Sequence, residues 1–319
     1  MKMPTLDDLA YFALVAQHGG FAAAERATGV PKSRLSRRLA DLEARLGARL
    51  IQRSTRRFAV TDVGQQVLRH ARAMLDEADA AQALADAHRG APRGSVRLAC
   101  PPALLRTAVG PLLADFLNAW PQVQLQVQAS NRNVDVWEDG VDLALRVRAP
   151  DAVLPQDEVV RPLALSPHLL VAAPRLLANA PPPALPHDLV HLPTLGLGNS
   201  PDEQHWRLRG PGGELAEHRH QPRLVVDDAG TLLDAALAGV GCAVLPRLLA
   251  HDALHSGALQ ELLPGWRAPP GVIQAAYASR QGRRTAVRQL LDALAEGFEQ
   301  LIAQRRCLAP TSADALSFQ

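Results

Sequence analysis

The sequence predicts an α/β protein that begins with a helix-turn-helix module and continues into an open sheet. Three observations lead to this fold class. Helical periodicity dominates the first 90 residues, a dense basic segment lies within them, and from about Gly94 short apolar strands alternate with helices. The 319 residues are enough for two or three compact units. A hydrophobic content of 47% with 21% charged residues is typical of a globular protein.

The N-terminal segment has the outline of a helix-turn-helix. Residues 6–17 place apolar side chains at helical spacing, and a glycine pair follows them. A second, short helix is expected over residues 21–28, closing on Gly29. Pro31 suits the first turn of a third helix, because its missing N–H would have no partner there. The four leucines of this third helix, at positions 35, 39, 42 and 46, share one side, which we expect to be buried.

The opposite side of the third helix is basic. Ten basic residues and two acidic ones lie between positions 26 and 57, although the whole chain has a net charge of only +2. For an isolated helix, a solvated face is the favoured explanation. Here the acidic partners one turn away are nearly absent, and the basic run continues into residues 49–61, which resemble two short strands around a turn. Arginine and serine on an exposed helix can contact base edges, and a basic hairpin can contact phosphates or the minor groove.

The same segment resembles the winged helix-turn-helix of LysR-type transcriptional regulators. The resemblance depends on the Ala-rich second helix, Ser36, "LEARLG" at 42–47, the Arg56–Arg57 pair and "VTDVG" at 60–64. Gly20, Ile51 and the Lys32-Ser33-Arg34 run depart from the family pattern, and the last of these bears on base preference. The DNA-contacting residues expected from this face and hairpin are Lys32, Ser33, Arg34, Ser36, Arg37, Arg38, Arg53, Thr55, Arg56 and Arg57.

A long connecting helix is expected to follow, opened by Thr61. Positions 67, 71, 74, 78, 81 and 85 are apolar and alternate spacings of four and three, which is a heptad seam made largely of alanine. The seam either pairs with a second copy, as the family resemblance implies, or lies on its own domain. Pro92 and nearby glycines end the helix. We therefore expect a DNA-binding domain over residues 1–60 and a linker with its hinge over 61–92.

The C-terminal part resembles the effector-binding half of the same family, which is similar to periplasmic binding proteins. "FLNAWPQVQLQV", "GVDLALRV" and "GVGCAVLPRLL" carry the resemblance. It implies an effector-binding domain over 93–303, with subdomain I at 93–163 and 270–303 and subdomain II at 164–269. We also expect a short helix over 134–140 and a disordered tail over 304–319, because the tail has no periodicity.

Ligands of open α/β sheets bind beyond the carboxyl ends of the strands. Arg146 lies at such a strand end, where it could provide the countercharge for an anionic effector. Alternatively, it pairs with a structural carboxylate such as Asp142 or Asp135, and the sequence leaves both interpretations open. The N–H groups that open a helix at Gly230 are a further candidate for a carboxylate. The expected effector-binding residues are Pro101, Pro102, Ala103, Ser130, Asn131, Arg146, Gly196, Leu197, Asp228 and Thr231.

Other chemistry finds little support in the sequence. The best metal spacings, His187-x3-His191 and His218-x-His220, lack accompanying cysteines or carboxylates, so no metal site and no cofactor are predicted. No catalytic constellation is present, so an enzyme is not predicted. Of the three cysteines, Cys100 and Cys242 lie near the proposed cleft, where inert packing is favoured over a redox sensor.

The combined prediction is a non-enzymatic, LysR-type, sequence-specific DNA-binding transcriptional regulator controlled by a small-molecule effector. Its expected partners are double-stranded operator DNA, an effector bound between two α/β subdomains, and a second or further copies in a homodimer or homotetramer. RNA polymerase is a further candidate partner. The N-terminus lacks the order of a signal peptide and no long apolar run exists, so a cytoplasmic location is expected. The rival class is an enzyme or solute-binding protein that uses the α/β half and carries the basic segment for another purpose.

Overall fold

The computed structural model describes residues 5–53, 58–87, 92–137, 139–150, 152, 158–178, 182–202, 204–278 and 284–310. The predicted DNA contacts Thr55, Arg56 and Arg57 lie outside these residues, as does the turn of the expected wing. The side chains of Arg53, Ala81 and Ala85 are also outside the description.

The N-terminal domain is the predicted helix-turn-helix with a two-stranded wing. Its elements are α1 (Leu6–Gln17), α2 (Phe21–Thr28), α3 (Lys32–Leu46), β1 (Ile51–Arg53) and β2 (Phe58–Val60), with β1 and β2 antiparallel. Phe12, Leu35, Leu42 and Leu50 are fully buried in its core. The expectation that all four leucines of α3 are buried is wrong for Leu46, which is 38% exposed at the helix end. Pro31 caps α3 from outside the helix rather than lying in its first turn.

The linker helix α4 (Asp62–Ala87) begins at a tight junction with the wing. Thr61 caps it, accepting a hydrogen bond from the backbone N–H of Gly64. A Cβ at Gly64 would lie 2.1 Å from the carbonyl oxygen of Leu50, so only glycine fits there. Val67 and Ala71, the first two seam positions, pack on the core of their own domain. Met74 and Ala78 are exposed, so the part of the seam open to a partner begins there.

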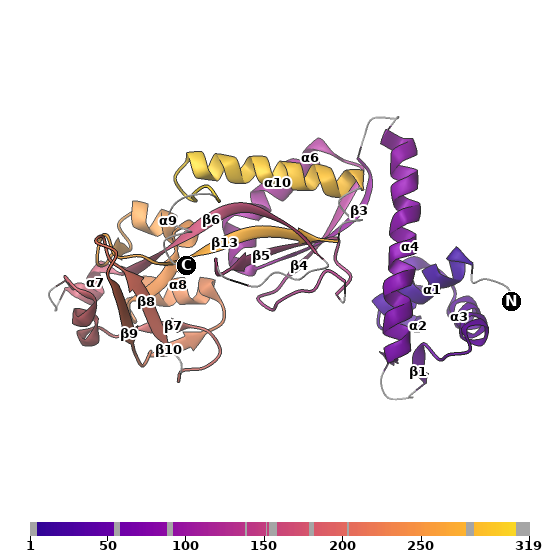
Figure 1. Ribbon diagram of the computed structural model, residues 1–319, viewed down its shortest axis with the longest axis horizontal. Helices are drawn as coiled ribbons and strands as arrows, with labels where there is room; N and C mark the ends of the chain where they lie inside the picture. Colours follow the sequence, from indigo (N-terminus) through magenta and orange to yellow (C-terminus); the bar gives the residue numbers. More distant parts are fainter. Residues whose placement is uncertain are drawn as a thin grey trace.

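The larger α/β part is built on one mixed sheet, with strand order β11-β6-β13-β5-β3-β4 and β12 also paired with β6. Figure 1 shows α10 lying along this sheet, while α4 stands between the sheet and the small N-terminal domain. The strands are β3 (Gly94–Cys100), β4 (Val123–Ala129), β5 (Leu143–Arg148), β6 (Val159–Ala172), β11 (Ala243–Pro246), β12 (Gln260–Glu261) and β13 (Ala268–Tyr277). Strands β3, β4 and β5 are parallel, as expected where helices connect them.

The helices and smaller strands cover the two ends of this sheet. They are α5 (Pro102–Leu104), a π-helical turn η1 (Leu105–Val109), α6 (Gly110–Ala119), α7 (Pro174–Leu177), a 3-10 turn η2 (Pro186–His191), β7 (Leu195–Leu197), β8 (His205–Arg209), β9 (Leu215–Arg219), β10 (Leu224–Val226), α8 (Ala229–Leu237), α9 (Arg247–His255) and α10 (Thr285–Ala303). One large core lies under α6 and α10, and two more lie around α8, α9 and the β8–β9 hairpin.

Two long strands join the halves of the α/β part. β6 pairs with β13 over its first part and with β11 and β12 over its last part. The expected subdomain boundaries, at 163/164 and 269/270, therefore fall inside β6 and β13, where the chain crosses from one half to the other. Within the described residues, none of the helices has the length and apolar character needed to cross a bilayer.

Two local expectations are wrong. The expected short helix over 134–140 is not found in the described residues of this segment. Residues 136, 137, 139 and 140 lie in turns, because Asp135 and Asp139 accept hydrogen bonds from nearby backbone N–H groups. The expected disordered tail is ordered at its start. Cys307 is buried in the main core, and Leu308 exchanges two backbone hydrogen bonds of 2.9 Å with Leu165 of β6. Residues 311–319 lie outside the described part of the chain.

Candidate DNA-binding surface and effector cleft

The outer face of α3 presents a row of polar and basic side chains to solvent. Lys32, Ser33, Arg34, Ser36 and Arg37 are all exposed. The αL conformation of Gly29, which ends α2, and Pro31 at the start of α3 set the turn between the two helices. Buried leucines on the inner face hold α3 against α1, so the exposed face has a fixed orientation.

Two of the predicted DNA contacts also have roles inside the domain. The guanidinium of Arg38 lies 3.2 Å from the carboxylate of Asp8 in α1, and it lies over the Tyr11 ring at 5.9 Å. Arg34 lies over the same ring at 5.5 Å. Within the described residues, Arg37 makes no such contact with the protein. Among the three arginines of this face, Arg37 is therefore the one most available to a base edge.

Asp8 is the buried anchor for this basic face. It completes a capping box with Thr5 and also pairs with Arg45. Burial opposes ionisation of Asp8, but hydrogen bonds from Thr5 and the charges of Arg45 and Arg38 outweigh it, so the pKa of Asp8 is lowered. The carboxylate therefore stays charged and neutralises part of the positive field inside the domain.

A cavity of about 360 Å³ lies between the two halves of the α/β part. Its walls come from α5 and η1, the ends of β4 and β5, the middle of β6 and β13, and the start of α8 and α9. Apolar side chains dominate, among them Leu104, Val147, Leu248 and Ile273. A mostly apolar cleft with a few polar groups is the usual form of a small-molecule site.

Three polar side chains of this cleft were missed at the level of sequence. Ser166 is buried and its hydroxyl has no hydrogen-bond partner within the described residues. His168 hydrogen-bonds the carbonyl of Pro269 through Nδ1 at 2.7 Å, so Nδ1 carries the proton and Nε2 is an acceptor. Burial lowers the pKa of His168 and keeps the ring neutral. Arg148, at the end of β5, is the third.

Only some of the predicted effector-binding residues line this cavity. Pro101, Ala103, Asn131 and Leu197 do. The residues that do not are Pro102, Ser130, Arg146, Gly196, Asp228 and Thr231. Asp228 caps α8 and accepts the backbone N–H of Thr231 at 2.8 Å, so that N–H is already bonded inside the protein. Gly196 is covered by the side chain of Gln204.

Arg146 is a structural residue rather than a countercharge in the cleft. It is 6% exposed, and its guanidinium lies 2.5 and 2.8 Å from the two carboxylate oxygens of Glu158. A third bond of 2.6 Å reaches the carbonyl of Val134. Of the two interpretations of Arg146, pairing with a structural carboxylate is therefore the one that the structure shows. The partner is Glu158, and not Asp142 or Asp135 as expected.

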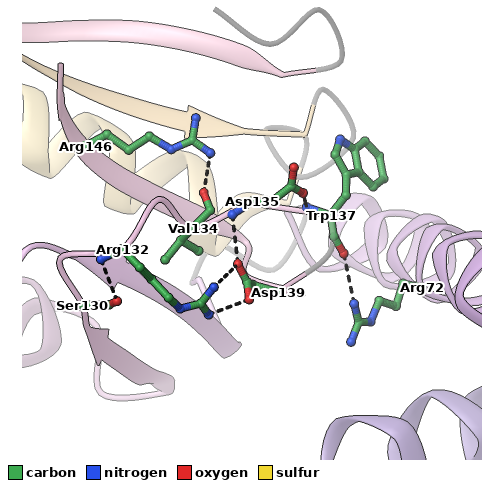
Figure 2. A network of polar contacts seen from close by, with 8 residues as sticks. All are labelled: Arg72, Ser130, Arg132, Val134, Asp135, Trp137, Asp139 and Arg146. Carbon is green, nitrogen blue, oxygen red and sulfur yellow. Dashed lines mark hydrogen bonds and ion pairs between the residues drawn. The ribbon is translucent and has the colours of Figure 1, made fainter. Parts of the chain in front are cut away.

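Polar contacts run from the cleft to the linker helix through residues 130–139 (Figure 2). At the cleft, the side chain of Asn131 donates to the carbonyl of Asp227 on the opposite wall at 2.9 Å. Arg132 binds both oxygens of Asp139, at 3.0 and 2.5 Å. At the other end, Arg72 of α4 donates to the carbonyl of Trp137 at 3.0 Å. One segment thus contacts both the effector cleft and the linker.

Redox and metal chemistry at the described cysteines and histidines depends on their burial and their neighbours. Burial raises the pKa of Cys100 and Cys242 to about 12 and that of Cys307 to about 11, which leaves the thiols protonated. His218 and His220 lie beside Trp206 on the β8–β9 hairpin. Among the described residues, no group of three or more histidine, cysteine or acidic side chains is placed to hold a metal ion.

Comparison with known proteins accounts for both halves of the chain. Residues 6–65 match the family model for bacterial regulatory helix-turn-helix proteins of the lysR family, and residues 89–299 match the model of the LysR substrate binding domain. Over 300 residues the chain is 34% identical to the HTH-type transcriptional regulator PtxR of Pseudomonas aeruginosa, covering 91% of this chain and 92% of that protein. The chain belongs to the LysR family.

A further relative and two solved structures match over nearly the whole length. The probable HTH-type transcriptional regulator LtrA of Klebsiella pneumoniae is 29% identical over 299 residues, covering 93% of this chain and 96% of that one. The structure of CrgA, a LysR-type transcriptional regulator from Neisseria meningitidis, aligns with a TM-score of 0.60 at 25% identity, covering 93% and 99%. A full-length OxyR variant from Pseudomonas aeruginosa aligns with a TM-score of 0.71 at 18% identity, covering 98% and 100%, and shares the fold.

The LysR family assignment confirms the predicted fold and function. The protein is a LysR-type transcriptional regulator with a helix-turn-helix DNA-binding domain and a two-subdomain effector-binding domain. This assignment also fits the positions of the two surfaces, because the basic face lies in the first domain model and the cavity lies in the second.

Proposed function

We propose that the exposed face of α3 reads operator DNA, with Arg37 as the main base-contacting residue. Ser33, Ser36 and Lys32 accompany it, and Arg34 and Arg38 contribute positive charge while remaining attached to Tyr11 and Asp8. The observation that carries this proposal is the contrast between Arg37, which is exposed and makes no hydrogen bond or ion pair within the described residues, and Arg38, which is ion-paired to Asp8. An unattached guanidinium can bind guanine bidentately without first breaking an ion pair inside the protein.

The proposed effector site is the cavity between the two halves of the α/β part. Its apolar walls favour a ligand with an apolar body, while Ser166 and the acceptor Nε2 of His168 favour one that carries a hydroxyl or similar group. Occupancy would change the contact between Asn131 and Asp227 across the cleft. The segment that carries Asn131 also contacts Arg72 of the linker, so closure would bias the position of the DNA-binding domain.

The proposed working form is a homodimer or a pair of dimers joined through the linker helices. Two copies would present two α3 faces to a two-fold operator, with half-sites separated by about one helical turn of DNA or a multiple of it. The exposed seam positions Met74 and Ala78 support this arrangement. Contact with RNA polymerase belongs to the same proposal and concerns the DNA-bound oligomer.

Selection of binding sites from random duplexes by the full-length protein tests the DNA-binding part. Enriched sequences should contain two related half-sites, and the Arg37→Ala protein should lose preference at one base pair of each half-site. Uniform loss of affinity on all sequences would assign Arg37 to phosphate contact only.

The effector site is tested by a thermal-shift screen of small organic molecules. A genuine effector should stabilise the wild-type protein, and the stabilisation should be lost when Ala103 is replaced by phenylalanine.

A further inference from the structure

The middle of β6 gives the effector cleft a polar wall. Ser166 and His168 are two positions apart in this strand, so their side chains leave it on the same face, about 7 Å apart along the chain. Both line the cavity of about 360 Å³. Ala164, two positions before Ser166, belongs to the large apolar core of the effector-binding domain. The two polar groups therefore lie on a face that is otherwise apolar.

A β-bulge in β13 fixes the orientation of the His168 ring. Between the partners of Ser166 and His168, β13 has one residue more than β6, and Pro269 and Pro270 occupy this bulge. The carbonyl of Pro269 accepts the Nδ1 proton of His168 at 2.7 Å. Nε2 is then an acceptor, and it has no hydrogen-bond partner within the described residues. Because burial lowers the pKa of His168, the ring stays neutral and keeps this pattern.

The hydroxyl of Ser166 is the second polar group without a partner. Ser166 is only 3% exposed, and its Oγ makes no hydrogen bond to any residue that the structure describes. A buried hydroxyl in this state costs free energy, because it has lost water and gained nothing in exchange. It can donate one proton and accept another. The wall thus offers a ligand one hydroxyl and one neutral acceptor.

The positive charge of Arg148 is directed away from this wall. Its neighbour Val147 faces the cavity, since a Cβ on Gly271 would lie 2.5 Å from Cγ1 of Val147. Successive side chains of a strand point to opposite faces, so Arg148 leaves β5 on the face that carries Arg146. There its guanidinium donates to the side-chain oxygen of Asn133. An anion beside Ser166 and His168 would therefore meet a hydroxyl and a lone pair.

We infer that the effector is an uncharged compound with an apolar body and a hydroxyl group, and that Ser166 and His168 select it. The inference rests on the proposed effector site. A hydroxyl of an alcohol or a phenol can donate to Nε2 of His168 and accept from Ser166, so it satisfies both groups. An ether can only accept from Ser166. A carboxylate has no proton for Nε2 and loses its hydration in an apolar cleft.

The test uses three probes with the same methylated ring. p-Cresol carries a hydroxyl, p-methylanisole an ether and p-toluate a carboxylate, and each is titrated into the full-length protein at neutral pH by calorimetry. p-Cresol should bind about tenfold more tightly than p-methylanisole, as expected for the loss of one hydrogen bond to a buried acceptor. p-Toluate should bind more weakly still. A fourth probe, p-methylbenzyl alcohol, distinguishes the two kinds of hydroxyl, because it should bind more tightly than p-cresol only if the site is shaped for an alcohol.

Two variants assign the selectivity to β6. Ser166→Ala removes a hydroxyl without a described partner, so it should not lower the unfolding temperature of the ligand-free protein, yet it should weaken p-cresol binding about tenfold. His168→Phe keeps a ring and removes the acceptor, so p-methylanisole should then bind at least as tightly as p-cresol. The matched controls are Ser256→Ala and His255→Phe at the exposed end of α9, which should bind like the wild type.

The results that contradict the ligand class differ from those that contradict the site. Tighter binding of p-toluate than of p-cresol, or a preference for p-cresol that survives in Ser166→Ala and His168→Phe, would overturn the ligand class and leave the cleft as the effector site. Binding that Ala103→Phe does not reduce, or no binding of any probe to the wild-type protein, would count against the proposed site and this inference together.

Discussion

In the proposed mode of DNA binding, the residues of α3 divide between contacts to DNA and contacts inside the domain. Arg38 and Arg45 are ion-paired to Asp8, whereas Arg37 has no contact of this kind in the described structure. A mutation of Arg38 therefore changes folding and DNA affinity together. Only Arg37 offers a direct view of sequence preference.

Replacing Arg37 with alanine should reduce discrimination between the preferred operator and a single-base variant by about 1–3 kcal/mol. The loss is expected because one bidentate contact to a base disappears while the fold stays intact. Competition binding with labelled operators measures it. The Lys32→Ala protein is the comparison, and it should lose affinity on all sequences alike and flatten the salt dependence.

The ionisation of Asp8 should make the N-terminal domain sensitive to acid. Its pKa is lower in the folded state than the ordinary aspartate value of 3.8, so its contribution to stability is present above that value. The contribution is lost as the pH falls through the folded-state pKa. Asp8→Asn should destabilise the domain near neutral pH and reduce the pH dependence of the unfolding temperature below about pH 4. An unchanged acid profile would show that Asp8 is not the responsible group.

At the scale of elements, one buried ion pair joins several segments of the effector-binding domain. The Arg146–Glu158 pair ties the end of β5 to the segment before β6 and to the turn at Val134. Both side chains are almost fully buried. A charge left unpaired in such surroundings is costly, although replacement of the whole pair by apolar residues is not.

Glu158→Gln should therefore lower the free energy of unfolding by about 3–5 kcal/mol, because it leaves the charge of Arg146 buried without a counterion. The midpoint of urea denaturation measures the change. Glu261→Gln is the matched control, because its partner Arg267 is 42% exposed and such a pair is worth at most about 1 kcal/mol. Similar losses in both proteins would refute the special role of the buried pair.

The linker helix provides the second prediction at this scale. Ala78→Glu places a charge on the exposed seam of α4 and should separate the proposed dimer, which sedimentation equilibrium detects as a fall in molar mass. Gln65→Glu, on the other side of the same helix, should leave the mass unchanged. A dimer that survives Ala78→Glu would have its interface elsewhere.

Periodicity predicted most of these elements because each depends on local spacing. The helix-turn-helix, the wing strands and the alternation of strands and helices all follow from it. Residues 134–140 could not be predicted in this way, because aspartate side chains there compete for the backbone hydrogen bonds. The ordered start of the C-terminal tail could not be predicted, because it depends on the pairing of Leu308 with Leu165. These two residues are 143 positions apart in the sequence.

The cleft shows the limit of sequence reasoning at the scale of the whole molecule. The ends of strands correctly located Pro101, Ala103, Asn131 and Leu197 at its wall. Ser166 and His168 lie in the middle of β6 and face the cavity only because this long strand crosses between the two halves. No local pattern distinguishes a strand that crosses from one that ends. The partner of Arg146 was likewise unpredictable, since Glu158 lies beyond a connection of no recognisable pattern.

Closure of the two halves depends in part on Asn131, which bridges the cleft to Asp227. Asn131→Ala should remove about 1 kcal/mol of support for the closed arrangement. Hydrogen exchange over residues 224–231 should then become faster. The matched control is Asn133→Ala, whose side chain contacts Arg148 on its own side of the cleft and should leave that exchange unchanged. If both variants behave alike, the effect comes from the loop and not from the bridge.

The three buried thiols have a practical consequence for observing this motion. Because Cys100, Cys242 and Cys307 stay protonated and enclosed, they should react with maleimide dyes far more slowly than a cysteine placed on the surface. The native cysteines of the wild-type chain should therefore contribute little labelling of their own when a dye is attached elsewhere. Cysteines introduced in place of Arg26 and Arg219 would carry a donor and an acceptor dye without removal of any native cysteine. The distance between the two domains then becomes measurable in single molecules as effector is added.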